Sequence, residues 1–118
     1  GCGQGRMARP LIEYLEGEGE GGDYTGLDIS AQGINWCQTH YSDLPNFQFI
    51  HMDVYNSRYN PKGLTKTAHY LFPVDDQSQD MIFLTSVFTH MLAKDVEAYL
   101  HEFSRVLKSI ESQIFLAI

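Results

Sequence analysis

The chain alternates short apolar runs with stretches of helical periodicity, and this alternation limits the folds open to it. Residues 24–29, 47–52 and 81–84 are short apolar runs, as expected of buried strands. Segments with apolar residues three or four positions apart lie between and after these runs, and that spacing predicts helices. Alternating strands and helices form parallel sheets with right-handed crossovers. We therefore expect an α/β fold: a doubly wound, mostly parallel sheet with helices on both faces.

Three helices are predicted. The first follows the glycines at the start of the chain, with Pro10 near its beginning, where a missing N–H costs least. The second is capped by Ser30, and the third begins near Ala93. Their inner faces are expected to comprise Met7, Ala8, Leu11, Ile12 and Leu15; Ile34, Cys37 and Tyr41; and Val96, Tyr99, Leu100, Phe103 and Leu107.

Two further predictions concern the second half of the chain. Residues 81–84 form a continuous apolar run typical of a central strand buried on both faces, and residues 113–118 predict one more buried strand. Residues 55–79 have neither period, and so long a connection is usually functional, a covering loop or poorly ordered. Its aromatic residues either cover a ligand or, as is more common, anchor the loop to the core; they are Tyr55, Tyr59, Tyr70 and Phe72.

Composition bounds the class of protein. The 118 residues suit one domain, and no apolar run approaches the ~20 residues that span a bilayer. A net charge of −7 argues against nucleic acid as a partner. Cys2 and Cys37 form no CxxC pair, so we expect reduced thiols in a cytoplasmic protein. The five histidines have no HxxxH spacing, and we expect no metal site.

Parallel sheets bind ligands where their strands end, so each turn from strand to helix is a candidate site. Gly1, Gly3 and Gly5 form a glycine-rich turn that opens the first helix, and its backbone can approach a ligand closely. Asp28 ends the next apolar run, at about the distance expected of a carboxylate that binds a ribose diol. The alternative role for Asp28 is a charge in the first turn of the helix beside Ser30.

Five segments in this order resemble the successive motifs of class I S-adenosylmethionine-dependent methyltransferases. The resemblance covers nearly the whole chain apart from the loop around Tyr59 to Tyr70. The segments are Gly1-Cys-Gly-Gln-Gly5, Tyr24-Thr-Gly-Leu-Asp28-Ile-Ser30, Phe49-Ile-His-Met-Asp53-Val54, Asp80-Met-Ile-Phe-Leu84 with Ser86-Val-Phe-Thr-His90, and Phe103-Ser-Arg-Val-Leu-Lys108.

The resemblance implies S-adenosylmethionine as cofactor, S-adenosylhomocysteine as product, and roles for named positions. The resemblance implies that Gly1, Gly3, Gln4 and Gly5 line the amino-acid and ribose part of the cofactor and that Asp28 binds the ribose hydroxyls. At the adenine, it implies that Ile29 packs on the ring, that Asp53 accepts the amino group and that the backbone N–H of Val54 binds the ring. Thr85 and Ser86 are implied to face the sulfonium. His90, the one candidate catalytic residue, faces the acceptor or, alternatively, caps or packs against a helix. Asp53 has an alternative role as a turn residue.

Departures from the family pattern lead us to expect a partial domain, truncated at both ends. The family's first strand should precede Gly1, a hairpin should follow Ile118, and Ser109-Ile-Glu-Ser112 replaces the usual Pro-Gly-Gly. The function expected is methyl transfer to a small-molecule acceptor, or cofactor binding without catalysis. A nicotinamide-dependent oxidoreductase is disfavoured, because Arg6 occupies the last glycine position of G-x-G-x-x-G.

Overall fold

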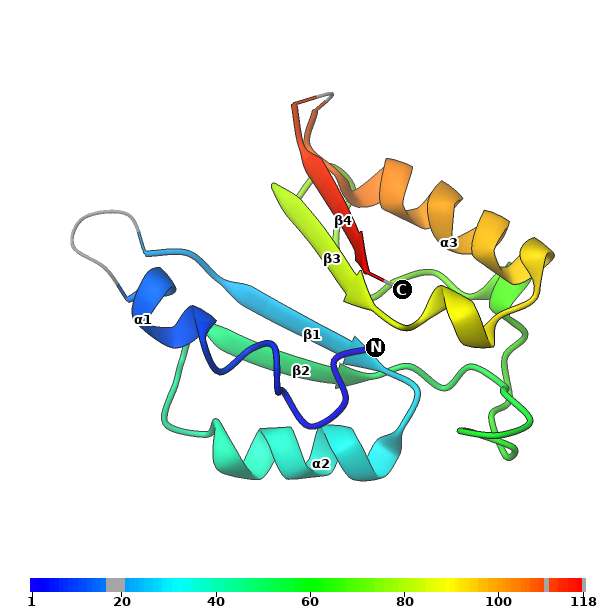
Figure 1. The fold of residues 1–118 in the computed structure, drawn as a ribbon, viewed down its shortest axis with the longest axis horizontal. Helices are drawn as coiled ribbons and strands as arrows, with labels where there is room; N and C mark the ends of the chain where they lie inside the picture. Colours follow the sequence, from blue (N-terminus) through cyan, green and yellow to red (C-terminus); the bar gives the residue numbers. More distant parts are fainter. Residues whose placement is uncertain (17–20, 110, 118) are drawn as a thin grey trace.

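The computed structural model describes residues 1–16, 21–109 and 111–117 (Figure 1). Helices alternate with strands along these ranges, as the sequence predicted. In chain order the elements are α1 (Leu11–Leu15), β1 (Tyr24–Asp28), α2 (Ala31–His40), β2 (Phe47–His51), the 3-10 turn η1 (Thr67–His69), β3 (Met81–Thr85), the 3-10 turn η2 (Phe88–His90), α3 (Ala93–Val106) and β4 (Gln113–Ala117).

The strands form two parallel pairs. In one pair Tyr24 of β1 lies opposite Phe47 of β2, and Asp28 lies opposite His51. In the other pair β3 runs parallel to β4. Within the described residues the two pairs share no backbone ladder, but the rings of Tyr24 and Phe83 lie 6.2 Å apart and connect β1 to β3. All four strands point their carboxyl ends toward the region around the first residue of the chain (Figure 1).

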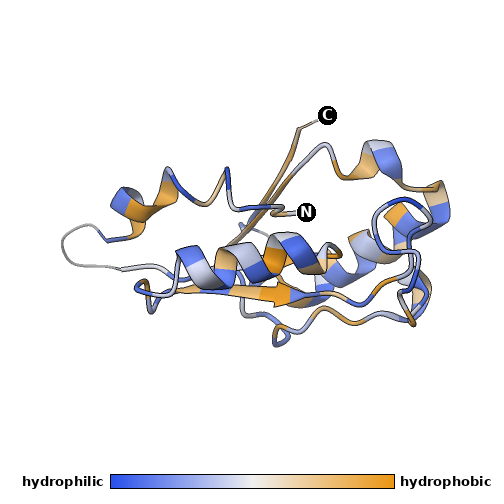
Figure 2. Cartoon of the chain, turned by 90° about the horizontal axis from the view of Figure 1, so that it is seen from below, coloured by the Kyte–Doolittle hydropathy of each residue, from blue (hydrophilic) through white to orange (hydrophobic). Residues whose placement is uncertain are grey.

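Helices cover opposite faces of these strands, which confirms the predicted doubly wound arrangement. Helix α2 packs on β1 and β2 through one apolar cluster, whose buried members include Ile34, Cys37 and Tyr41. Helix α3 packs through a second cluster, with Tyr99 and Phe103 buried beside residues of β1 and β3. Ser30 caps α2 as predicted, since its Oγ accepts the Gly33 N–H at 3.2 Å. The alternating polar and apolar residues of α2 are visible in Figure 2.

Four predictions about burial and about where an element begins are wrong, one of them that Leu100 lies on the inner face of α3, since this residue is 45% exposed. Strand β4 is exposed along its whole length, with Phe115 and Leu116 each 53% exposed, because among the described residues only β3 pairs with it. Strand β3 is half-buried, and its first residue Met81 is 54% exposed. Helix α1 begins only after Pro10, so Met7 lies in the preceding turn and is exposed.

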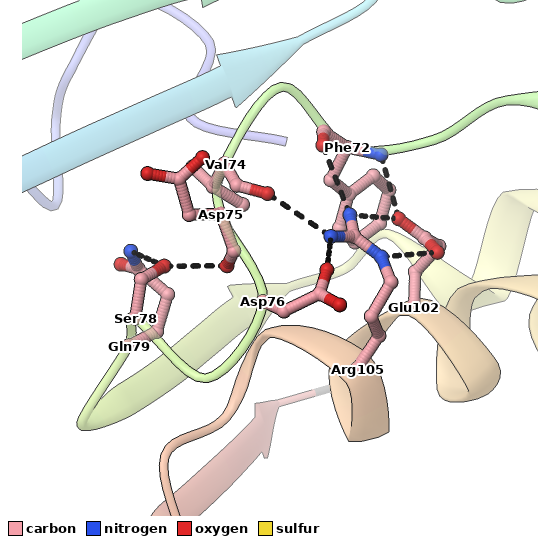
Figure 3. Close-up of polar contacts among 8 residues, drawn as sticks. All are labelled: Phe72, Val74, Asp75, Asp76, Ser78, Gln79, Glu102 and Arg105. Carbon is pink, nitrogen blue, oxygen red and sulfur yellow. Dashed lines mark hydrogen bonds and ion pairs between the residues drawn. The ribbon is translucent and has the colours of Figure 1, made fainter.

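A charged cluster fixes the connection between β2 and β3 to α3 (Figure 3). Glu102 of α3 accepts the Phe72 N–H at 2.7 Å and two hydrogen bonds from Arg105, at 2.6 and 2.9 Å. The same guanidinium donates to the carbonyls of Phe72 and Val74 and to Asp76. The sequence prediction for α3 missed this cluster, because a buried glutamate interrupts the apolar face on which the prediction relied.

Candidate functional site

Asp28, at the carboxyl end of β1, holds the glycine turn at the start of the chain. Its Oδ2 accepts the backbone N–H of Gly3 and its Oδ1 accepts that of Ser30, both at 2.7 Å. The residue is 9% exposed. A carboxylate offers about four acceptor positions, so these two bonds leave capacity for two hydroxyl donors. The alternative role, a charge in the first turn of α2, is not found, because Ser30 is the cap of that helix and Asp28 precedes it. The bond from the Ser30 N–H is compatible with diol binding.

The three glycines of the turn have different surroundings. Gly3 adopts φ +54°, and a Cβ atom added there would meet nothing within 4 Å. Gly5 adopts φ +73° and is buried against the ring of Tyr41, whose hydroxyl donates to the Gly5 carbonyl at 3.0 Å. A side chain at Gly1 would collide with Val87. The turn is thus packed at Gly1 and Gly5 and open at Gly3, where a ligand can approach the backbone.

Two thiols flank the Gly3 carbonyl oxygen. The Sγ of Cys37 in α2 lies 3.5 Å from that oxygen, and the Sγ of Cys2 lies 3.9 Å from it. Burial raises the pKa of the Cys2 thiol to about 12 and also raises the pKa of the Cys37 thiol. Both groups are therefore neutral at physiological pH, and they serve here as packing groups.

The end of β2 lies beside the end of β1, since the Met52 N–H donates to the Asp28 carbonyl at 2.8 Å. Asp53 follows directly, and its carboxylate accepts long bonds from Asn60 Nδ2 at 3.3 Å and the Leu64 N–H at 3.4 Å. The turn role considered for Asp53 is thus present. The Val54 N–H, predicted to bind an adenine ring, donates instead to the Met52 carbonyl at 2.8 Å. A ligand would have to displace that bond.

Ile29 and the residues after β3 complete this edge of the strands. Ile29 is partly buried against the cluster under α3, and its carbonyl lies 3.1 Å from His51 Nε2. Thr85 ends β3, and Ser86 adopts φ +54°, a left-handed conformation that is uncommon for a residue with a side chain. Such strain often marks a functional position.

His90 ends the turn η2 and is exposed. Its ring makes an edge-on contact with Tyr59, the two centroids lying 5.6 Å apart. Of the two alternatives for His90, packing is observed, although the partner is the loop after β2 rather than a helix. Of the loop aromatics, Phe72 is buried and Tyr70 partly so, whereas Tyr55 and Tyr59 are exposed.

The predicted cofactor residues thus lie along one edge of the strands. Gly3 is hydrogen-bonded to Asp28, and the Asp28 carbonyl is hydrogen-bonded to the residue before Asp53. Gly1 lies close to Val87, just after β3, so the glycine turn also adjoins the end of that strand. Gln4 is exposed beside them.

Sequence reasoning missed two features of this edge. The first is Gly33, whose position inside a helical pattern is a signal of close packing. The second is Arg58, which lies beside the predicted loop aromatic Tyr59 in a segment free of acidic residues.

Metal-binding clusters and membrane-spanning helices are both absent from the described ranges. No group of three or more histidine, cysteine, aspartate or glutamate side chains gathers so as to hold a metal ion. None of the helices that the structure describes is long and apolar enough to cross a bilayer.

Comparisons with known proteins identify a family and a fold for this chain. Residues 1–110 match the family described as "Methyltransferase domain". The fold is similar to the crystal structures of the YcgJ protein from Bacillus subtilis (TM-score 0.68, 19% identity) and the PH0226 protein from Pyrococcus horikoshii OT3 (TM-score 0.68, 20% identity). Each alignment covers 98% of this chain, and 40% and 44% respectively of those proteins. The chain thus spans less than half of the length of either protein.

The matched fold is that of the class I S-adenosylmethionine-dependent methyltransferases, which confirms the resemblance found in the sequence. This chain belongs to the methyltransferase-domain family, since the match extends over 110 of its 118 residues.

Proposed function

We propose that the protein transfers a methyl group from S-adenosylmethionine to a small-molecule acceptor. The observation that carries the proposal is the bond between Gly3 and Asp28, which unites an open glycine turn with a buried carboxylate. A backbone that a ligand can approach, beside a hydrogen-bond acceptor, suits a nucleoside bearing a ribose diol. Because Cys2 and Cys37 are both unpaired, a cytoplasmic location is part of the proposal.

The chain's residues have a limited task in such a reaction. S-adenosylmethionine, when bound, supplies an electrophilic methyl group on a good leaving group. Gly3 and Asp28 would hold the amino-acid and ribose part, and Asp53 the adenine. Thr85 and Ser86 would border the sulfonium. Positioning of this kind contributes on the order of 7–11 kcal/mol to a rate enhancement. A general base is needed in addition only if the acceptor is protonated at working pH. His90 is the candidate for that role.

Ligand-dependent thermal stability of the full-length protein tests cofactor choice. We expect S-adenosylhomocysteine to raise the melting temperature and NAD to leave it unchanged. The open position of Gly3 and the exposure of Arg6, where a dinucleotide fingerprint has a tightly packed glycine, favour that result. Stabilisation by NAD alone would refute the proposal and support an oxidoreductase.

The second candidate function, cofactor binding without catalysis, needs a different measurement. The measurement is whether the full-length protein transfers a radiolabelled methyl group to compounds in a small-molecule extract. It distinguishes a methyltransferase from a non-catalytic binding module. Labelled product supports the enzyme, whereas tight S-adenosylhomocysteine binding without any labelled product supports the non-catalytic module.

A further inference from the structure

The segment that follows β2 has a charge opposite to that of the rest of the chain. Residues 54–74 contain Arg58, Lys62 and Lys66 and none of the 15 acidic residues, although the chain carries a net charge of −7. Within the described part of the chain, none of these three cations forms an ion pair. An anion approaching the molecule is therefore attracted here.

A tight turn presents one of these cations at a fixed place. Asn56 Oδ1 accepts the N–H groups of Arg58 and Tyr59, at 3.0 and 2.9 Å, and the backbones of Asn56 and Asn60 exchange two hydrogen bonds. Asn60 Nδ2 also donates to the Val54 carbonyl at 3.0 Å and to the Asp53 carboxylate. The turn is thus fastened to the end of β2, beside the predicted cofactor residues.

The same turn reaches η2, which follows β3. Tyr59 contacts the ring of His90 edge-on, at an interplanar angle of 67°. The Arg58 guanidinium carbon lies 5.2 Å from the centroid of the Tyr59 ring, within cation–π distance. Tyr59 remains 44% exposed and Arg58 is exposed. His90 is the residue that we expect to face the acceptor, and its contact with Tyr59 therefore puts Tyr59 and Arg58 beside the expected acceptor position.

We propose that the methyl acceptor is an anionic small molecule with a planar ring, whose acidic group binds Arg58 and whose ring packs against Tyr59 beside His90. This inference rests on the proposed function. Guanidinium groups bind carboxylates and phosphates through paired, charge-assisted hydrogen bonds, and an aromatic face offers a second planar group a favourable contact. A long nucleic acid fits less well, since the net charge of −7 repels a phosphate backbone beyond this segment.

Binding of simple anions to the full-length protein, saturated with S-adenosylhomocysteine, tests the inference. The probes are benzoate and phenyl phosphate, with benzamide and benzylamine as neutral and cationic analogues, and titration calorimetry or NMR reports binding. We expect the two anions to bind and the two analogues to bind much less. Arg58→Gln should weaken anion binding by about tenfold, and Tyr59→Leu should weaken the ring-bearing anions more than inorganic phosphate.

Lys108→Gln is the matched control, since it removes one cation at the far end of α3, where Lys108 pairs with the exposed Asp80. It should leave anion binding unchanged. The inference is overturned if neither anion binds, if benzamide binds as well as benzoate, if Arg58→Gln has no effect, or if a single-stranded oligonucleotide competes through Arg58 at lower concentration than phenyl phosphate. Normal S-adenosylhomocysteine binding alongside any of these results leaves the proposed function intact. If the unmodified protein does not bind S-adenosylhomocysteine at all, the proposed function is refuted instead.

Discussion

Gly33 of α2 faces Gly3 so closely that a Cβ atom added at Gly33 would lie 2.9 Å from the Gly3 carbonyl oxygen. The helix thus rests directly on the backbone of the glycine turn. Cys37, one turn further along α2, contacts the same oxygen through its Sγ. With Asp28 bonded to the N–H of Gly3, the peptide groups on both sides of this residue are fixed. The predicted cofactor site is therefore shaped by the packing of α2 against the glycine turn as well as by the strands.

Gly33→Ala tests this contact. Alanine is a better helix former than glycine by about 1 kcal/mol, so an uncrowded position would gain stability. Here the added methyl group must displace either α2 or the glycine turn, and we expect a net loss of stability in urea unfolding together with weaker S-adenosylhomocysteine binding. Asn35→Ala, at an exposed position of the same helix, is the control and should be neutral or slightly stabilising. Greater stability in Gly33→Ala would contradict the contact.

Gly3 and Gly5 should respond differently to alanine. Both have positive φ, and a left-handed alanine costs about 1–2 kcal/mol. At Gly3 no neighbour obstructs a methyl group, whereas at Gly5 the methyl group would lie 2.8 Å from the ring of Tyr41. We expect Gly5→Ala to be the more destabilising in urea unfolding. Gly3→Ala should mainly weaken S-adenosylhomocysteine binding, since it occupies the open face. The reverse order of stabilities would exclude this interpretation of the turn.

Asp28→Asn tests the expected ribose contact. The amide keeps the shape of the side chain but exchanges one charged acceptor for a donor, and hydrogen bonds to charged groups contribute about 1.5–3 kcal/mol. We expect the dissociation constant of S-adenosylhomocysteine to rise at least about tenfold in titration calorimetry. Asp23→Asn, at an exposed position just before β1, should bind as the unmodified protein does. If Asp28→Asn bound S-adenosylhomocysteine with unchanged affinity, Asp28 would have no role in cofactor binding beyond its bonds to the Gly3 and Ser30 N–H groups.

The sequence predicted the elements well where periodicity and local chemistry agreed. Strands β1 and β2, the Ser30 cap and the inner face of α2 are all found in the structure. Their signals are local, since apolar spacing and a capping residue act within one element. The exposure of β4 was not predictable in this way, because the burial of an apolar strand depends on which other elements cover it.

The candidate site also has features that the sequence could predict and features that it could not. The placement of Gly3 and Asp28 follows from the order of strands and turns, so the sequence could indicate it. The bond from the Val54 N–H to Met52 and the contact between Tyr59 and His90 depend on the path of a loop without periodicity. No local pattern encodes that path. The sequence does mark this loop by its length, its aromatic residues and the lack of acidic residues across residues 54–74, but none of these signals gives its contacts.

The cluster of Glu102 and Arg105 predicts a specific dependence of stability on pH. Hydrogen bonds from Arg105, with that of the Phe72 N–H added, hold the pKa of Glu102 below its ordinary value. Because the pKa is lower in the folded state than in the unfolded state, the stabilisation is fully present above the unfolded pKa of about 4.3. It is lost as the pH falls through the folded pKa. Urea unfolding of the full-length protein between pH 7 and pH 3 should record this loss.

Glu102→Gln should reduce stability at pH 7 by about 2 kcal/mol, since Arg105 then loses its buried carboxylate while the glutamine oxygen still reaches the Phe72 N–H. The variant should also lose less stability than the unmodified protein between pH 5 and pH 3, because no proton is taken up at this position. Glu97→Gln, at an exposed position of the same helix, should match the unmodified protein in both respects. If Glu102→Gln kept the full acid dependence, other carboxylates would account for it, and the cluster would contribute to stability only through packing.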